Sequence, residues 1–389
     1  MKKIMFIVMV LLLSIVPSLS IPVRLASASG LLQGEQNLNL ALEQCGLSTN
    51  YTTRELLDLA GNKYILVECK SGGYGIYHPT AQVFVEFSAE NPSPYLGKQN
   101  IRYGGPMNYY CVEGNQYTNL LSGEQMDISA TQLSQLTAKE EQLTCVYQSF
   151  SASSQSASAR AANTTHMIPN AYYFQKMYYF GTCSNDAYTQ MAASIMLSYY
   201  ANYANVNFVP TNCIVPLAGT STNFQTWGSM PELTSSLCQE LVSITQYLGE
   251  DILIEKADVL EDVLTEYYSR HLITGIVQET LSSPYFVDSN MRDILEDNNP
   301  MVMIGKFTMP DGTKQNRAVV CYGYSIISNV TYYRVHMGYG THTAVDLANQ
   351  WTKNLFYQIY YIDYTGNHVH SRNFVVNGVS YCGCGTIYS

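Results

Sequence analysis

The histidines and cysteines are the side chains of this 389-residue chain best suited to chemistry, and their spacing limits what that chemistry could be. His368 and His370 lie two apart, so they share one face if the segment is extended, as metal ligands can. No third ligand follows at a defined spacing, and Cys382-Gly383-Cys384 is too small a pattern to indicate a metal or redox site. We therefore predict neither a metal nor a cofactor.

Tyr188, Arg317 and His336 lie at the ends of apolar stretches that are expected to form a helix and two strands. An apolar stripe with helical spacing predicts a buried central helix, and it consists of Tyr188, Met191, Ala192, Ile195, Met196 and Tyr199. Ser184 or Asp186 is expected to cap this helix. Arg317 opens an apolar run typical of a strand, and His336 ends another. If residues 317–324 and 331–337 form a hairpin, Arg317 and His336 lie nearly opposite each other at its open end.

Several stretches resemble the secreted bacterial cysteine peptidases of the streptopain-like branch of the papain-like fold. In the second half of the chain the resemblance rests on Ile195–Tyr200, Ala318–Tyr324 and Val335–Gly340. In the first half, residues 61–68, 73–77, 93–96 and 103–106 are similar to the pro-domain of such precursors.

The resemblance implies a nucleophilic cysteine at the N-terminus of the central helix, where the helix dipole and a neighbouring imidazolium lower the thiol pKa. Counting back eleven residues from Tyr199 gives Tyr188, whereas the Gly-Thr-Cys triplet of the family stands five residues earlier and ends at Cys183. Five helical residues correspond to about 140° of rotation. Because the apolar stripe is in phase with Tyr188, we assign Tyr188 to the nucleophile position and Cys183 to the loop before the helix.

In the resembling family the base is a histidine, and the resemblance implies that Arg317 stands at the position of this base. The position of the residue that orients the base corresponds to His336. Arginine stays protonated and offers no acceptor, so it cannot take a proton from a thiol. A phenol with an ordinary pKa near ~10 is a poor attacking group on an amide at neutral pH. The catalytic dyad is therefore predicted to be lost.

The resemblance implies an α+β fold, namely a papain-like two-lobed peptidase fold with a central-helix lobe and an antiparallel sheet lobe, preceded by a small α+β pro-domain-like unit. Lys2 and Lys3, the apolar run Ile4–Val16 and Ala26-Ser27-Ala28 fit a signal peptide over residues 1–28. The pro-domain-like unit is expected at 30–130, a helical or flexible linker at 131–165 and the peptidase-like domain at 166–389.

Local patterns predict the individual elements. Helices are expected at 53–60, 231–247, 260–271 and 289–296, and strands at 63–69, 74–77, 82–87, 92–95, 301–307, 318–324, 332–337, 355–364 and 373–376. The stretch 149–165 lacks large apolar residues after Phe150, which favours a flexible linker.

Composition limits the partners. The net charge is −10, and removal of residues 1–28 takes away three bases and no acid, which argues against nucleic acid or an anionic membrane as a partner. The 33 tyrosines suit a surface that packs or binds through tyrosine. The ten cysteines are an even number in an exported chain and permit disulfides. Buried thiols or bridges are expected at Cys45, Cys69, Cys111, Cys145, Cys213 and Cys238.

Three functions remain open at this stage. The first is a secreted pseudopeptidase whose cleft binds a peptide or protein, with the pro-domain-like unit as an intramolecular partner. The second is an active secreted thiol peptidase that uses Cys183 with His336. The third is a structural or adhesive extracellular protein.

Overall fold

The computed structural model describes residues 28–129, 131–132, 134–135, 141–153, 163–171, 174–175, 186–210, 231–282, 288–339, 342–366, 374–376 and 379–381. Residues 1–27 of the predicted signal peptide lie outside these ranges, as do Cys183, Ser184, Cys213, His368, His370, Cys382 and Cys384. Within the described ranges, no helix combines the length and apolar character needed to cross a membrane.

The first part of the chain forms one helix and eight strands. These are α1 (Ala28–Gln44), β1 (Tyr51–Asp58), β2 (Lys63–Cys69), β3 (Tyr74–His78), β4 (Val83–Ser88), β5 (Ile101–Tyr103), β6 (Tyr109–Glu113), β7 (Gln116–Asn119) and β8 (Gln125–Asp127).

The later part contains both helices and strands. Its helices are α3 (Glu141–Ser153), α5 (Tyr188–Tyr203), η2 (Val206–Phe208), α6 (Pro231–Tyr247), α7 (Ala257–Arg270), α8 (Asp288–Glu296) and α9 (Asn349–Leu355). Its strands are β9 (Thr164–Met167), β10 (Ile276–Ser282), β11 (Met301–Thr308), β12 (Lys314–Ile327), β13 (Val330–His336), β14 (Val345–Ala348), β15 (Phe356–Tyr364), β16 (Phe374–Val376) and β17 (Val379–Tyr381).

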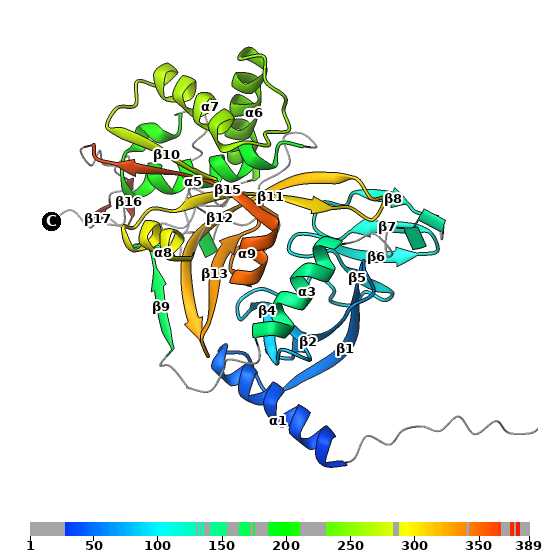
Figure 1. The fold of residues 1–389 in the computed structure, drawn as a ribbon. Coiled ribbons are helices and arrows are strands. Elements are labelled where there is room, and N and C mark those ends of the chain that lie inside the picture. The colour runs from blue at the N-terminus through cyan, green and yellow to red at the C-terminus, as the bar shows by residue number, and fades with distance from the viewer. Residues whose placement is uncertain are drawn as a thin grey trace, which may run out of the picture.

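Most described strands build one large mixed sheet, while β16 and β17 pair with each other in a separate two-stranded sheet. Fifteen strands share the large sheet, in the order β10-β15-β11-β12-β13-β14-β4-β3-β2-β1-β5-β6-β7-β8, and β9 pairs with β12 off this path. Most pairs are antiparallel, while β1 and β5 are parallel. In Figure 1 the blue and cyan strands β1–β8 lie beside the yellow and orange strands β11–β15, and α6 and α7 cover the far end near β10.

The predicted α+β fold, with a papain-like central-helix lobe and an antiparallel sheet lobe, is wrong. Strand β4 of the front part pairs with β14 of the rear part, through Asp346 opposite Phe87 and Leu347 opposite Glu86. An unpaired edge strand exposes backbone donors and acceptors that tend to pair with another strand. Here two such edges satisfy each other, so the sheet runs continuously through both parts instead of ending at a lobe boundary.

Helix α5 lies in the interior against this sheet. It packs on β12 and β11, and its residues from Tyr188 to Ala201 are all buried. Many tyrosines are also interior residues, contrary to the surface role suggested by composition. Among the largest fully buried side chains are Tyr64, Tyr74, Tyr95, Tyr103, Tyr109, Tyr110, Tyr267, Tyr322 and Tyr333.

Most predicted elements of the described residues are confirmed. Strand β2 and helix α6 have the predicted bounds, and α7, α8, β3, β4, β11, β12, β13, β15 and β16 overlap their predictions. The predicted helix at 53–60 is wrong, because this stretch forms β1 and pairs with both β2 and β5. The predicted strand at 92–95 is also wrong and contains a turn instead.

Ordered elements occupy both ends of the stretch 149–165. Helix α3 continues to Ser153 and buries Phe150 completely. At the other end, Thr164 and Thr165 belong to β9, where they pair with Ile326 and Ser325 of β12. Residues 154–162 lie outside the described ranges, and the domain boundary itself stays a prediction.

The described cysteines include thiols and a bridged residue. Cys45, Cys69, Cys111, Cys145 and Cys321 are free, while Cys238 is disulfide-bonded. Burial raises the pKa of the Cys321 thiol to about 12, so this thiol stays protonated and unreactive at neutral pH.

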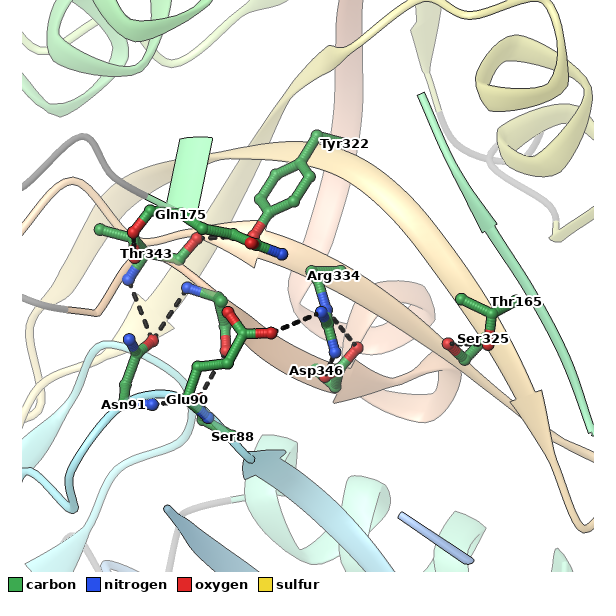
Figure 2. A network of polar contacts seen from close by, with 11 residues as sticks. Ser88, Glu90, Asn91, Thr165, Gln175, Tyr322, Ser325, Arg334, Thr343 and Asp346 are labelled. Carbon is green, nitrogen blue, oxygen red and sulfur yellow. Dashed lines mark hydrogen bonds and ion pairs between the residues drawn. The ribbon is translucent and has the colours of Figure 1, made fainter. Parts of the chain in front are cut away.

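Polar contacts reinforce the join between β4 and β14 (Figure 2). The Asn91 side-chain oxygen accepts hydrogen bonds from the backbone N–H groups of Thr343 and Ala344, at 3.1 and 2.9 Å. The Ser88 hydroxyl donates to the Ala344 carbonyl oxygen at 2.6 Å. Tyr322 of β12 donates to the Thr343 carbonyl oxygen at 2.7 Å. The loop after β4 is thereby tied to the chain that leads into β14 and, through it, to β12.

An ion-pair network lies beside these contacts. Arg334 of β13 contacts both oxygens of Asp346, with Nη2 2.8 Å from Oδ2 and Nε 3.2 Å from Oδ1. Its Nη1 is 3.1 Å from Glu90. Asp346 is fully buried, and burial raises its pKa while Arg334 lowers it. The Arg334 guanidinium therefore compensates a carboxylate that has no access to water.

The buried and exposed halves of this network should differ in their contribution to stability. We expect Asp346→Asn to reduce the free energy of unfolding by about 3–5 kcal/mol, because the largely buried Arg334 then keeps only the exposed Glu90 as a counter-charge. The control Glu90→Gln should cost less than about 1 kcal/mol, since the Glu90 side chain is 41% exposed. Urea unfolding of both variants measures the difference. Equal losses would contradict a dominant role for the Arg334–Asp346 pair.

Candidate functional site

The structure brings two of the four predicted site residues into contact. Tyr188 is the first residue of α5, and Arg317 lies in β12. The Arg317 guanidinium carbon is 3.9 Å from the centroid of the Tyr188 ring. A guanidinium within about 6 Å of a ring centroid is attracted by the negative face of the ring. The positions assigned to nucleophile and base are thus occupied by a cation–π pair.

Close packing of β11 fixes the backbone at Arg317. Arg317 pairs with Gly305, where the register between β11 and β15 shifts. A Cβ atom on Gly305 would lie 2.8 Å from the Phe356 ring and 3.1 Å from the Leu355 carbonyl oxygen. A larger residue at this position would push β15 away, so glycine keeps the strands beside Arg317 close together.

The start of α5 differs from the sequence prediction. The N-cap residue is Ala187, and no side chain caps the helix. Asp186 precedes it with a φ of 86°, an uncommon value for a residue with a side chain. The predicted cap at Asp186 is therefore wrong, and Ser184 lies outside the described ranges.

A residue of the front part completes the site. Glu124, in the turn between β7 and β8, places Oε2 3.1 Å from Nη2 of Arg317. Its other oxygen, Oε1, accepts a hydrogen bond from the Gln315 amide at 3.2 Å. The Arg317 side chain is only 2% exposed, while that of Glu124 is 33% exposed. One carboxylate therefore reaches a buried guanidinium from the solvent side.

Asp186 adds a second acidic group to the surroundings of Arg317. Burial raises the pKa of Asp186, Arg317 lowers it, and Glu124 and Asp251 raise it again, with a net increase. These opposing influences show that Asp186 lies within electrostatic reach of the Arg317–Glu124 pair. Glu124 is thus the carboxylate in contact with Arg317, and Asp186 is a second acid that senses its charge.

His336 is held away from this pair. It lies opposite Val320 in the β12–β13 register, three residues from Arg317, so the predicted near-opposition of Arg317 and His336 is not observed. His336 is fully buried, and its Nδ1 accepts a hydrogen bond from the Gly338 N–H at 2.9 Å. Because a backbone N–H can only donate, Nδ1 carries no proton and a neutral ring has its proton on Nε2.

The turn after β13 nevertheless extends toward α5. Gly338 has a φ of 80°, and a Cβ atom there would lie 2.5 Å from the Met191 side chain. Tyr339 then places its ring centroid 6.3 Å from that of Tyr188. Tyr339, which comes three residues after His336, therefore lies beside the Tyr188 ring.

The chemistry of Arg317 and Tyr188 differs from that of a nucleophile and its base. Arginine cannot act as a base at neutral pH, and a neutral phenol is a weak nucleophile. A planar guanidinium beside an aromatic face is instead suited to holding a carboxylate. Among the described residues, no group of three or more histidine, cysteine, aspartate or glutamate side chains could hold a metal ion. Cys183 lies outside those residues.

Sequence reasoning missed Glu124 and Gln315. Glu124 is 193 positions from Arg317 along the chain, and an acid after a glycine in a short turn is a common surface pattern. Only the fold brings it to β12. Gln315 lies two residues before Arg317 and therefore on the same face of the strand. This two-residue spacing was the one local signal available.

No profile of a known protein family matches the chain, and no curated protein matches it at a significant score. The resemblance to cysteine peptidases therefore stays a prediction from the sequence stretches alone.

A double-mutant cycle should measure the Tyr188–Arg317 interaction. We expect Tyr188→Leu to cost about 1–2 kcal/mol more in the wild-type background than in Arg317→Met, because a desolvated cation–π pair is lost only in the first case. Tyr188→Phe should retain most of this coupling, since the ring face makes the contact. Chemical unfolding of the single and double variants gives the coupling energy.

The chain contains a matched surface control. Arg270 lies over the Tyr247 ring at 4.8 Å and pairs with Glu266, but the Arg270 side chain is 38% exposed. The Tyr247–Arg270 coupling should be about 0.5 kcal/mol or less. A coupling at Tyr188–Arg317 no larger than this surface value would contradict a desolvated interaction.

Proposed function

We propose that this chain binds a peptide or protein segment without cutting it, at the site formed by Tyr188 and Arg317. The observation that carries the proposal is the 3.9 Å contact between the Arg317 guanidinium and the Tyr188 ring. A residue that is permanently charged stacks on one that is neutral at physiological pH. Both side chains are buried in this structure, so a ligand reaches them once Glu124 moves aside, and neither is equipped to activate a nucleophile.

The proposal includes an origin among secreted cysteine peptidases. The stretches around Ile195–Tyr200 and Ala318–Tyr324 support it, because they resemble the helix and strand that carry the dyad in that family. Export through the signal-like residues 1–28 and action outside the cell belong to the same proposal. The net charge of −10 favours a peptide or protein over nucleic acid as the ligand.

The geometry of His336 favours binding over thiol catalysis. A thiol–imidazole dyad needs a ring nitrogen that can accept the thiol proton. Nδ1 of His336 already accepts the Gly338 N–H, and the other nitrogen of a neutral ring is a donor. Catalysis by Cys183 with His336 would first have to break this turn contact inside a fully buried site.

Peptide capture tests binding and cutting together. The purified chain is incubated with a mixture of unstructured peptides, and the retained peptides are identified by mass spectrometry. Intact peptides should be retained, and Arg317→Leu should weaken their binding by about tenfold, the loss expected for one charged hydrogen bond. Arg270→Leu, at the surface arginine, should leave retention unchanged.

Two results would overturn this function. Cleaved products that disappear in Cys183→Ala or His336→Ala would establish the thiol peptidase. Epoxide labelling of Cys183 that depends on His336 would have the same meaning, because such reagents trap activated thiolates. Retention of no peptide by the wild-type chain would exclude binding at this site.

A further inference from the structure

Glu124 binds to the site in the way a ligand carboxylate would. Its Oε2 contacts Nη2 of Arg317 at 3.1 Å and its Oε1 accepts from the Gln315 amide at 3.2 Å. Both donors come from β12, two residues apart, and both oxygens of one carboxylate are used. Such two-point recognition is typical of carboxylate binding by arginine and a neighbouring amide.

Arg317 has more donors than Glu124 uses. Nε and Nη1 of Arg317 are buried and have no hydrogen-bond partner among the described residues. A buried guanidinium with unused donors is unfavourable on its own, because each donor loses water without a replacement. The site can therefore gain further hydrogen bonds from a ligand whose carboxylate approaches in the guanidinium plane.

Glu124 is attached to the edge of the structure rather than to its core. It follows β7 and precedes β8, strands of four and three residues at one end of the large sheet. Its side chain is one third exposed, whereas Arg317 is almost completely buried. The Glu124 carbonyl oxygen accepts a hydrogen bond from the N–H of buried Asn119 at 2.8 Å, so rotation of the Glu124 side chain alone would free the guanidinium and leave β12 in place.

We propose that Arg317, Gln315 and Tyr188 form a binding site for a single carboxylate of a peptide, and that Glu124 occupies this site in the present structure. This inference rests on the proposed peptide-binding function and names its ligand chemistry. The carboxylate belongs to an acidic side chain or to a peptide C-terminus, since both present the same pair of oxygens.

We expect a ligand carboxylate to replace Glu124 and not to bind beside it, because the surroundings of Arg317 are acidic. Asp186 already lies within electrostatic reach of Arg317 and Glu124. A ligand carboxylate added beside Glu124 would meet like charges around one cation. The ligand must therefore displace Glu124, and its apparent affinity is reduced by the fraction of molecules in which Glu124 is bound.

Peptide titrations test this competition. Three peptides of one unstructured sequence are compared: one with a glutamate and an amidated C-terminus, one with glutamine and a free C-terminus, and one with glutamine and an amidated C-terminus. Fluorescence anisotropy gives their affinities for wild type and Glu124→Gln. Glu113→Gln changes an exposed acid elsewhere in the front strands and serves as the control.

At least one carboxylate peptide should bind wild type about tenfold more tightly than the fully amidated peptide. Glu124→Gln should raise that affinity by about fivefold, since it removes a partly exposed competitor, and Glu113→Gln should not. Whichever carboxylate peptide gains identifies the source of the group. Glu124→Asp shortens the side chain by one methylene and should give a smaller gain in peptide affinity. It replaces Glu124→Gln in the titration if that variant unfolds.

Equal binding of the amidated peptide and both carboxylate peptides would overturn the carboxylate site and leave peptide binding intact. An unchanged affinity in both Glu124 variants would overturn the competition. Absence of binding by all three peptides to every variant would instead refute the proposed function.

Discussion

The pairing of β4 with β14 determines the relative positions of the front and rear strands. It joins two sets of strands into one sheet through residues more than 250 positions apart, as Ser88 and Ala344 illustrate. The adjoining Arg334–Asp346 ion pair holds β13 and β14 together from within. With this frame set, the β7–β8 turn of the front part and β12 of the rear part can meet, and Glu124 can reach Arg317.

Buried tyrosine hydroxyls form polar contacts inside the front strands. Glu86 of β4 is completely buried and accepts hydrogen bonds from the hydroxyls of Tyr74, Tyr103 and Tyr109, at 2.7, 2.8 and 2.6 Å. Burial raises the pKa of Glu86, while the three hydroxyls lower it. A carboxyl group can lie here because its oxygens have donors in place of water. The high tyrosine content thus serves the interior as much as any surface.

Local elements were predictable from sequence, and long-range pairing was not. The apolar runs of β2 and α6 predict those elements with the observed bounds, because their residues follow one periodicity throughout. Strand β14 was missed because it is short and contains Asp346, whose burial depends on Arg334 of another strand. The β4–β14 pair, which overturns the predicted fold class, depends on that same strand. The Tyr188–Arg317 contact was anticipated from positions in a resembling family, whereas Glu124 had no local signal.

A site that consists of arginine and tyrosine differs from a thiol–imidazole pair in its ability to transfer a proton. A thiol and an imidazole exchange a proton near neutral pH, and this exchange is what activates the nucleophile. Arginine remains cationic over that range, and tyrosine remains neutral. The charge presented by Arg317 is therefore constant, and the Tyr188 ring and Glu124 stabilise it in the ground state. The chemistry of Arg317 and Tyr188 is therefore suited to recognition of a charge and not to transfer of a proton.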